Sequence, residues 1–194
     1  MAKAKGTILL GIVKYLRKNR EHALRVLPAE LHHYLSEKIF LSAWYPEEDL
    51  IRLIRARLRL HGGSEDEVLE AMGRMTVQGH AEGVYAHLLE GGGRGAATEA
   101  LWSSQHDTGT LSSTRESSTT SRLELVGYAH PSREMCRIVE AYVGETLRLA
   151  GMTDVSAEKL SCAARGEAHC SWRFTWRRPA ESSGTVRSQP QRKT

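Results

Sequence analysis

The chain has 194 residues, of which 40% are hydrophobic, and carries a formal net charge of +4 and three cysteines. This length and hydrophobic content predict one domain with its own core. The odd number of cysteines argues against a scaffold held by disulfides, and no apolar run approaches the roughly 18 residues of a membrane span. The N-terminus lacks a signal-peptide pattern, so we expect a cytoplasmic protein.

Short helical segments are expected over residues 21–27 and 28–35, and a long helix follows Trp44-Tyr45-Pro46. Acidic residues fill the first turn of that helix, where the helix dipole favours negative charge. Arginines crowd its polar side. Because no aromatic residues are interleaved with them, we expect a solvated face and no nucleic-acid binding.

The next helix begins at a capping box of Ser64 and Glu67 and is expected to run toward Glu90. Its glycines weaken it as an isolated helix, but they would allow a ligand or another element to approach closely. We therefore expect a ligand pocket between this helix and the sheet. The candidate lining residues are Gly79, His80, Gly83, His87 and Trp102.

The C-terminal half reads as a hairpin, a helix and a second hairpin. Residues 110–115 and 121–128 form the first hairpin, and a helix begins after Ser132. The second hairpin has strands over residues 155–164 and 170–176. The fold class is therefore α+β, with helices packed on a roughly four-stranded antiparallel sheet. One domain is expected over residues 5–178, followed by a disordered basic tail over 179–194.

The three cysteines lie on the second hairpin and the helix before it. Cys162 and Cys170 flank a tight turn, and Cys136 lies near the apolar face of the helix. Three converging thiolates would suit zinc. Three buried cysteines that only pack as small hydrophobic groups are the alternative, which the spacing taken by itself favours.

Cys136 and the segment Cys162-Ala-Ala-Arg-Gly-Glu-Ala-His-Cys170 resemble the 4-vinyl reductase domain family, especially the sensing domains of phenol-responsive bacterial activators. The resemblance implies a fold related to haem-nitric-oxide-binding domains, a small apolar or aromatic ligand, and a structural zinc. The family's fourth zinc ligand is a glutamate, and its position here is Lys159. The alternatives for that ligand are Glu158 after a bulge, His130, Glu134, His169 or water.

A second resemblance extends over residues 5–177. It rests on Gly6 with its apolar run, on Trp44-Tyr45-Pro46, on Trp102 with Asp107-Thr108-Gly109, and on the cysteine hairpin. These features are similar to a myxobacterial paralogous family with no assigned activity. The resemblance implies a source and a fold, but no reaction.

No catalytic set is visible, so an enzyme related to the reductases is the minority interpretation. We expect a small-molecule-binding or sensory module that signals through a homodimer or a partner protein. A structural interaction domain without a ligand is the alternative. Haem is not expected, because a histidine such as His80 or His87 is more often satisfied in a core or solvated than bound to iron.

Overall fold

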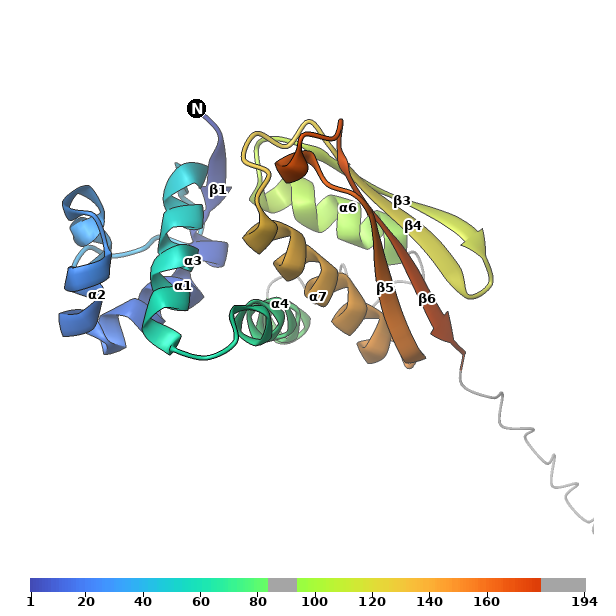
Figure 1. The fold of residues 1–194 in the computed structure, drawn as a ribbon, viewed down its shortest axis with the longest axis horizontal. Helices are drawn as coiled ribbons and strands as arrows, with labels where there is room; N and C mark the ends of the chain where they lie inside the picture. Colours follow the sequence, from blue (N-terminus) through green and yellow to red (C-terminus); the bar gives the residue numbers. More distant parts are fainter. Residues whose placement is uncertain (84–93, 179–194) are drawn as a thin grey trace, which may run out of the picture.

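The computed structural model describes residues 1–83 and 94–178, and the tail predicted over 179–194 lies outside them. Its C-terminal part contains a four-stranded antiparallel sheet with the strand order β3-β4-β6-β5. Helices α6 and α7 cover one face of this sheet (Figure 1). The elements of this part are α6 (Arg94–Gln105), β3 (Thr110–Ser117), β4 (Thr120–Val126), α7 (Arg133–Leu149), β5 (Thr153–Ser161), η2 (Ala163–Arg165) and β6 (Cys170–Arg177).

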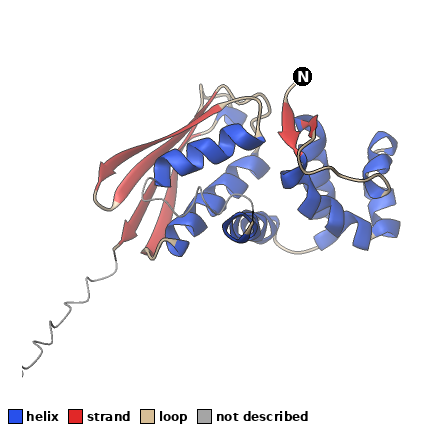
Figure 2. Cartoon of the chain, turned by 180° about the vertical axis from the view of Figure 1, so that it is seen from behind, coloured by secondary structure: helices blue, strands red, loops and turns tan. Residues whose placement is uncertain are grey.

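The N-terminal part is mostly helical. Its last helix, α4, packs against α7 on the side away from the sheet, and the helices that precede α4 lie beyond it (Figure 2). The molecule is therefore layered, with the sheet at one end and the first three helices at the other. No helix in the described residues is both long and apolar enough to cross a lipid bilayer. The elements of this part are β1 (Lys3–Lys5), α1 (Gly6–Lys18), α2 (Arg20–Val26), η1 (Ala29–Leu35), β2 (Trp44–Pro46), α3 (Glu47–His61) and α4 (Glu65–Glu82).

The expected α+β class and antiparallel sheet are confirmed. The predicted helix starts also hold, since Ser64 Oγ accepts a hydrogen bond from the Glu67 amide and Ser132 Oγ accepts one from the Met135 amide. In β6, Trp172 and Phe174 are almost completely buried, as their alternation with Arg173 predicts. Local periodicity and capping chemistry were therefore sufficient for these elements.

Two N-terminal details differ from the prediction. The domain was predicted to begin at residue 5, but β1 already starts at Lys3 and pairs antiparallel with β2, which includes Trp44 and Tyr45. Glu47 was interpreted only as a favourable charge at a helix start, yet it is fully buried. Both features depend on partners far away in the chain, which local patterns do not encode.

Candidate functional site

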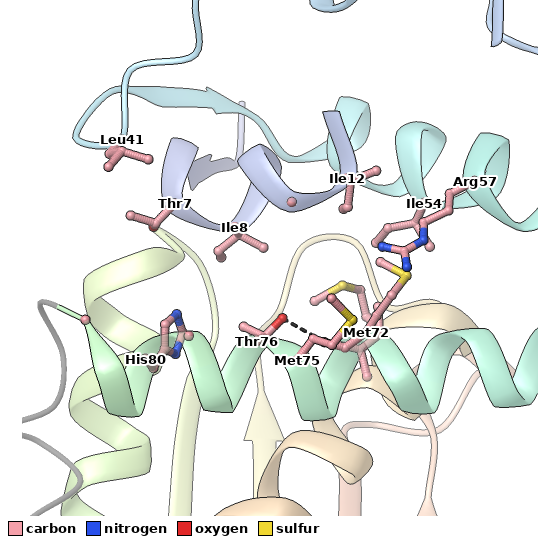
Figure 3. A pocket seen from close by; sticks show the side chains of 15 residues that line it. Thr7, Ile8, Ile12, Leu41, Ile54, Arg57, Met72, Met75, Thr76 and His80 are labelled. Atoms are coloured by element: carbon pink, nitrogen blue, oxygen red, sulfur yellow. Dashed lines mark hydrogen bonds between the residues drawn. The ribbon is translucent and has the colours of Figure 1, made fainter. Parts of the chain in front are cut away.

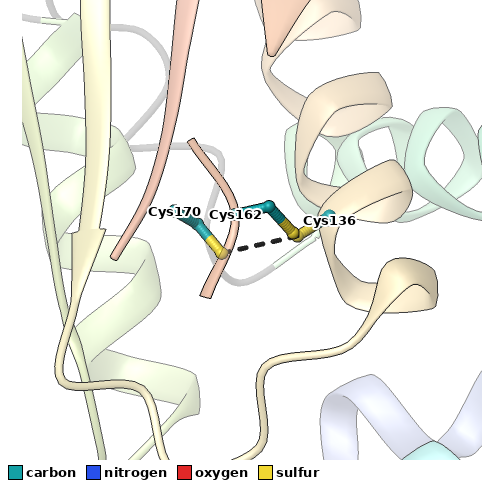
Figure 4. A group of neighbouring side chains, drawn as sticks. All are labelled: Cys136, Cys162 and Cys170. Carbon is teal, nitrogen blue, oxygen red and sulfur yellow. Dashed lines mark hydrogen bonds between the residues drawn. The ribbon is translucent and has the colours of Figure 1, made fainter. Parts of the chain in front are cut away.

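The cysteine cluster lies where α7 meets the β5–β6 hairpin (Figure 4). Cys136 Sγ is 3.8 Å from Cys162 Sγ and 3.5 Å from Cys170 Sγ, and all three residues are buried. A tetrahedral zinc with bonds of about 2.3 Å separates its sulfur ligands by about 3.8 Å. The three sulfurs therefore lie at separations that are compatible with a tetrahedral metal site, and no histidine, aspartate or glutamate joins this cluster among the described residues.

Lys159 occupies the remaining side of the cluster. Its ammonium lies 3.2 Å from Cys136 Sγ and 3.3 Å from the centroid of the Trp172 ring. The hydrogen bond from Cys136, the amide of Ala163 and the charge of Lys159 all lower the pKa of Cys170. The pKa of Cys136 is raised, because its proton is held in that same hydrogen bond and because it is buried. These contacts favour the thiolate form of Cys170, which lies in the same cluster as the Lys159 ammonium.

The structure does not bring the carboxylates considered as fourth ligands to the sulfurs. Glu158 lies opposite Arg173 in the sheet, and their side chains form an ion pair of 3.3 Å. Adjacent strand residues face opposite sides, so Lys159 points to the cysteines and Glu158 points away. Glu134 pairs with Arg55 at 2.8 Å, and His169 lies 3.6 Å from a Glu124 carboxylate oxygen.

A cavity of about 420 Å³ lies between the N-terminal helices and the layer formed by α4 and α7 (Figure 3). This size falls in the range of about 300–1,000 Å³ that is typical of ligand sites. Its wall is mostly apolar and contains no acidic residue among the described residues. The lining residues are Thr7, Ile8, Gly11, Ile12, Leu41, Ile54, Arg57, Met72, Met75, Thr76, Gly79, His80, Gly83, Met135 and Ile138.

The predicted pocket residues are distributed over two cavities. Gly79, His80 and Gly83 line the large cavity, whereas Trp102 lines an adjacent cavity of about 80 Å³ between α6 and α7. His87 lies outside the described residues. The large cavity is on the side of α4 that faces the N-terminal helices, and not between α4 and the sheet as expected. The reason is that α7 lies between α4 and the sheet.

His80 is a buried residue with partners at both ring nitrogens. Its Nδ1 is 3.0 Å from the Tyr142 hydroxyl, and its Nε2 is 3.1 Å from Gln105 Nε2. The amide of Gln105 donates to Nε2, so the proton of the neutral ring is on Nδ1. Burial lowers the pKa of His80 to about 4, below the ordinary value of 6.5. The ring is therefore neutral at physiological pH.

This pKa predicts a loss of stability in acid. The unfolded chain gains a proton below about pH 6.5, whereas folded His80 stays neutral until about pH 4. The free energy of unfolding should fall in this window by on the order of 2–3 kcal/mol. Urea titrations at several pH values should show a shallower decline in His80→Gln. The same change at exposed His22 should leave the decline as it is, and equal declines in all three proteins would contradict the prediction.

The sequence did not predict the positions of two residues, Glu47 in the core and Arg57 in the cavity wall. Glu47 accepts a hydrogen bond from His106 Nδ1, and the His106 ring stacks on Trp102 with centroids 4.0 Å apart. This buried pair joins the start of α3 to the end of α6. Arg57 was grouped with the solvated arginines of its helix, but it lines the large cavity. The apolar neighbours Ile54 and Leu58 are the sequence signal that could have placed Arg57 near the core boundary.

Comparison with solved structures identifies the fold as that of H-NOX domains. A structure from a study of haem distortion in the H-NOX family has a TM-score of 0.63 and 14% identity, with 98% of this chain and 100% of that chain covered. An oxygen-binding H-NOX domain related to soluble guanylate cyclases has a TM-score of 0.61 and 14% identity, with 90% and 96% covered.

A third match is an H-NOX protein from S. oneidensis in the Fe(II)NO ligation state. It has a TM-score of 0.61 and 12% identity, with 89% of this chain and 99% of that chain covered. No protein-family model matches the sequence, and no curated protein matches it. At these identities the matches show the fold of this chain.

The matches correct the expectation concerning haem. We expected none, but the fold is one in which solved relatives are described with haem, so the expectation was wrong. In this chain, His80 is the histidine that lines the large cavity among the described residues. Iron could reach its Nε2 only if Gln105 moved away. Within residues 1–83 and 94–178, His80 as arranged is therefore not free to bind iron.

Proposed function

We propose that this chain is a small-molecule-binding sensory module whose ligand occupies the cavity between the N-terminal helices and α4. The observation that carries the proposal is this preformed apolar cavity between two helical layers. The H-NOX fold supports it, because solved proteins with this fold are described as binding oxygen or nitric oxide. The resemblance to the 4-vinyl reductase family and to the myxobacterial paralogous family agrees with a small apolar or aromatic ligand.

The signal would leave the module through a second copy of the chain or through a partner protein. Leu41 lines the cavity and is 51% exposed, and the neighbouring Phe40 is 56% exposed. Ligand in the cavity would therefore touch a segment that also presents apolar surface to the outside. The alternative function is an interaction domain whose cavity holds no ligand.

The cysteine cluster is proposed as a structural zinc site held by Cys136, Cys162 and Cys170, with water as the fourth ligand. The sulfur separations support this proposal. Zinc would replace the protons of the thiols and tie α7 to the β5–β6 hairpin. Lys159 must turn away from the sulfurs when the metal binds, since two cations would repel each other.

A neutral probe and a cavity-filling variant test the proposed ligand site. N-Phenyl-1-naphthylamine should bind the wild-type protein, and Gly11→Phe should weaken its binding at least about tenfold. Gly11 lines the cavity, and a Cβ atom added there meets nothing within 4 Å. The control is Lys14→Phe, because exposed Lys14 is on the same helix outside the cavity. Equal weakening in both variants, or no binding by the wild type, would favour the ligand-free interaction domain.

Native mass spectrometry of protein from its own host would identify the ligand and the metal directly. We expect a retained organic molecule and one zinc per chain. An absorbance spectrum of the same sample would show a Soret band if the retained molecule is haem. A protein without any bound molecule would contradict the sensory proposal.

A further inference from the structure

Arg57 is the charged side chain of the cavity that has no anionic partner. Its neighbours Arg52 and Arg55 on α3 pair with Glu30 and Glu134, but no ion pair of Arg57 exists among the described residues. Its Nε is buried without a hydrogen-bond partner, and its guanidinium lies 4.7 Å from the centroid of the Tyr15 ring. Burial lowers the pKa of Arg57 below its ordinary value, but an arginine stays charged.

A half-buried guanidinium that contacts only water and the Tyr15 ring is stabilised further when an anion completes its hydrogen bonds. The cavity wall offers nothing that does so, because the described lining contains no acidic residue and His80 is turned to Tyr142 and Gln105. The remaining wall near Arg57 is apolar, including Ile12, Ile54 and Met72. A ligand with an anionic group on an otherwise apolar body would pair with Arg57 and pack against this apolar wall.

We propose that the ligand of this cavity is an apolar molecule with one carboxylate, which Arg57 binds. The inference rests on the proposed function and specifies the ligand class. A carboxylate matches the planar fork of a guanidinium through two parallel hydrogen bonds. A phosphate monoester carries more charge than this single cation neutralises. Figure 3 shows Arg57 and His80 at opposite ends of the cavity, with Ile8 and Thr76 between them, so the apolar body extends from α3 toward the end of α4.

Decanoate and 1-decanol form a matched pair of probes for this proposal, since they differ in the head group. Decanoate should bind the wild-type protein more tightly than decanol. Arg57→Met should weaken decanoate binding about 10- to 100-fold and leave decanol binding unchanged, because only decanoate loses charged hydrogen bonds to the guanidinium. Exposed Arg59 is on the same helix outside the cavity, so Arg59→Met should leave both affinities unchanged.

Melting temperatures show whether a variant binds decanoate more weakly because it lacks the guanidinium or because it is less folded. Arg57→Met removes an unpaired, half-buried charge, so its melting temperature should be at least that of the wild type. Arg57→Lys keeps the charge but loses the fork, and it should bind decanoate with intermediate affinity. This variant also serves as the second measurement if Arg57→Met does not fold.

The possible outcomes distinguish a failure of the carboxylate proposal from a failure of the proposed sensory function. If the neutral naphthylamine binds but decanoate does not, the cavity is a ligand site and the carboxylate proposal is wrong. If decanoate binds equally to wild type and Arg57→Met, Arg57 is not the anchor and the proposal is likewise overturned. If no probe enters the cavity, the sensory function itself fails. A Soret band in protein from its own host would also overturn the proposal of a ligand with one carboxylate, because haem carries two.

Discussion

Gly73→Ala should lower the free energy of unfolding by about 2–3 kcal/mol, although alanine is intrinsically the better helix former. Gly73 is buried on α4 where this helix crosses α7. A Cβ atom there would lie 2.6 Å from the Ile138 carbonyl oxygen and 2.9 Å from the Tyr142 amide nitrogen. These atoms belong to the backbone of α7, so the two helices would have to move apart. Thermal unfolding should show a midpoint roughly 5–10 °C lower.

The same substitution at Gly79 is the matched control. Gly79 is exposed on the same helix, and an added Cβ meets nothing within 4 Å. Gly79→Ala should therefore raise the free energy of unfolding by about 0.5–1 kcal/mol through helix propensity. If both variants shifted stability in the same direction, the close contact between α4 and α7 would not be present in solution.

Lys159→Glu should increase zinc affinity at least about 100-fold, because it removes a cation from the cluster and supplies a fourth ligand. Lys159 pairs with Trp172 in the sheet and faces the three sulfurs, so a glutamate carboxylate at this position would point to the same place. Competition with a chromophoric chelator under reducing conditions measures the affinity. The gain should disappear when Cys170→Ser is added, since one thiolate ligand is then lost.

Glu158→Lys provides the control for charge alone. Glu158 is on the opposite face of β5, paired with Arg173, so this change should leave zinc affinity nearly unchanged. If Lys159→Glu binds zinc no better than the wild type, the cluster is not a metal site. The three cysteines would then serve only as core packing around the Lys159 ammonium.

Much of the C-terminal half follows from local sequence. Ser132 begins α7 because its hydroxyl caps the Met135 amide, and the alternation through Trp172 and Phe174 specifies the buried face of β6. Cysteines on both sides of one hairpin turn must lie close together, which makes Cys162 and Cys170 neighbours in any such fold. These features are decided within a few residues of chain.

The tertiary structure decided which residues that are distant in the chain contact each other. Glu47 is buried against His106, which is far along the chain, and neither position carries a local signal for the pairing. The α4 glycines predicted that another group approaches this helix closely. Whether that group is α7 or a ligand depends on the order of the layers. Arg57 became a candidate anchor only when α4 and α7 enclosed its side of α3. Periodicity specifies that a face is buried, whereas non-local packing determines what it is buried against.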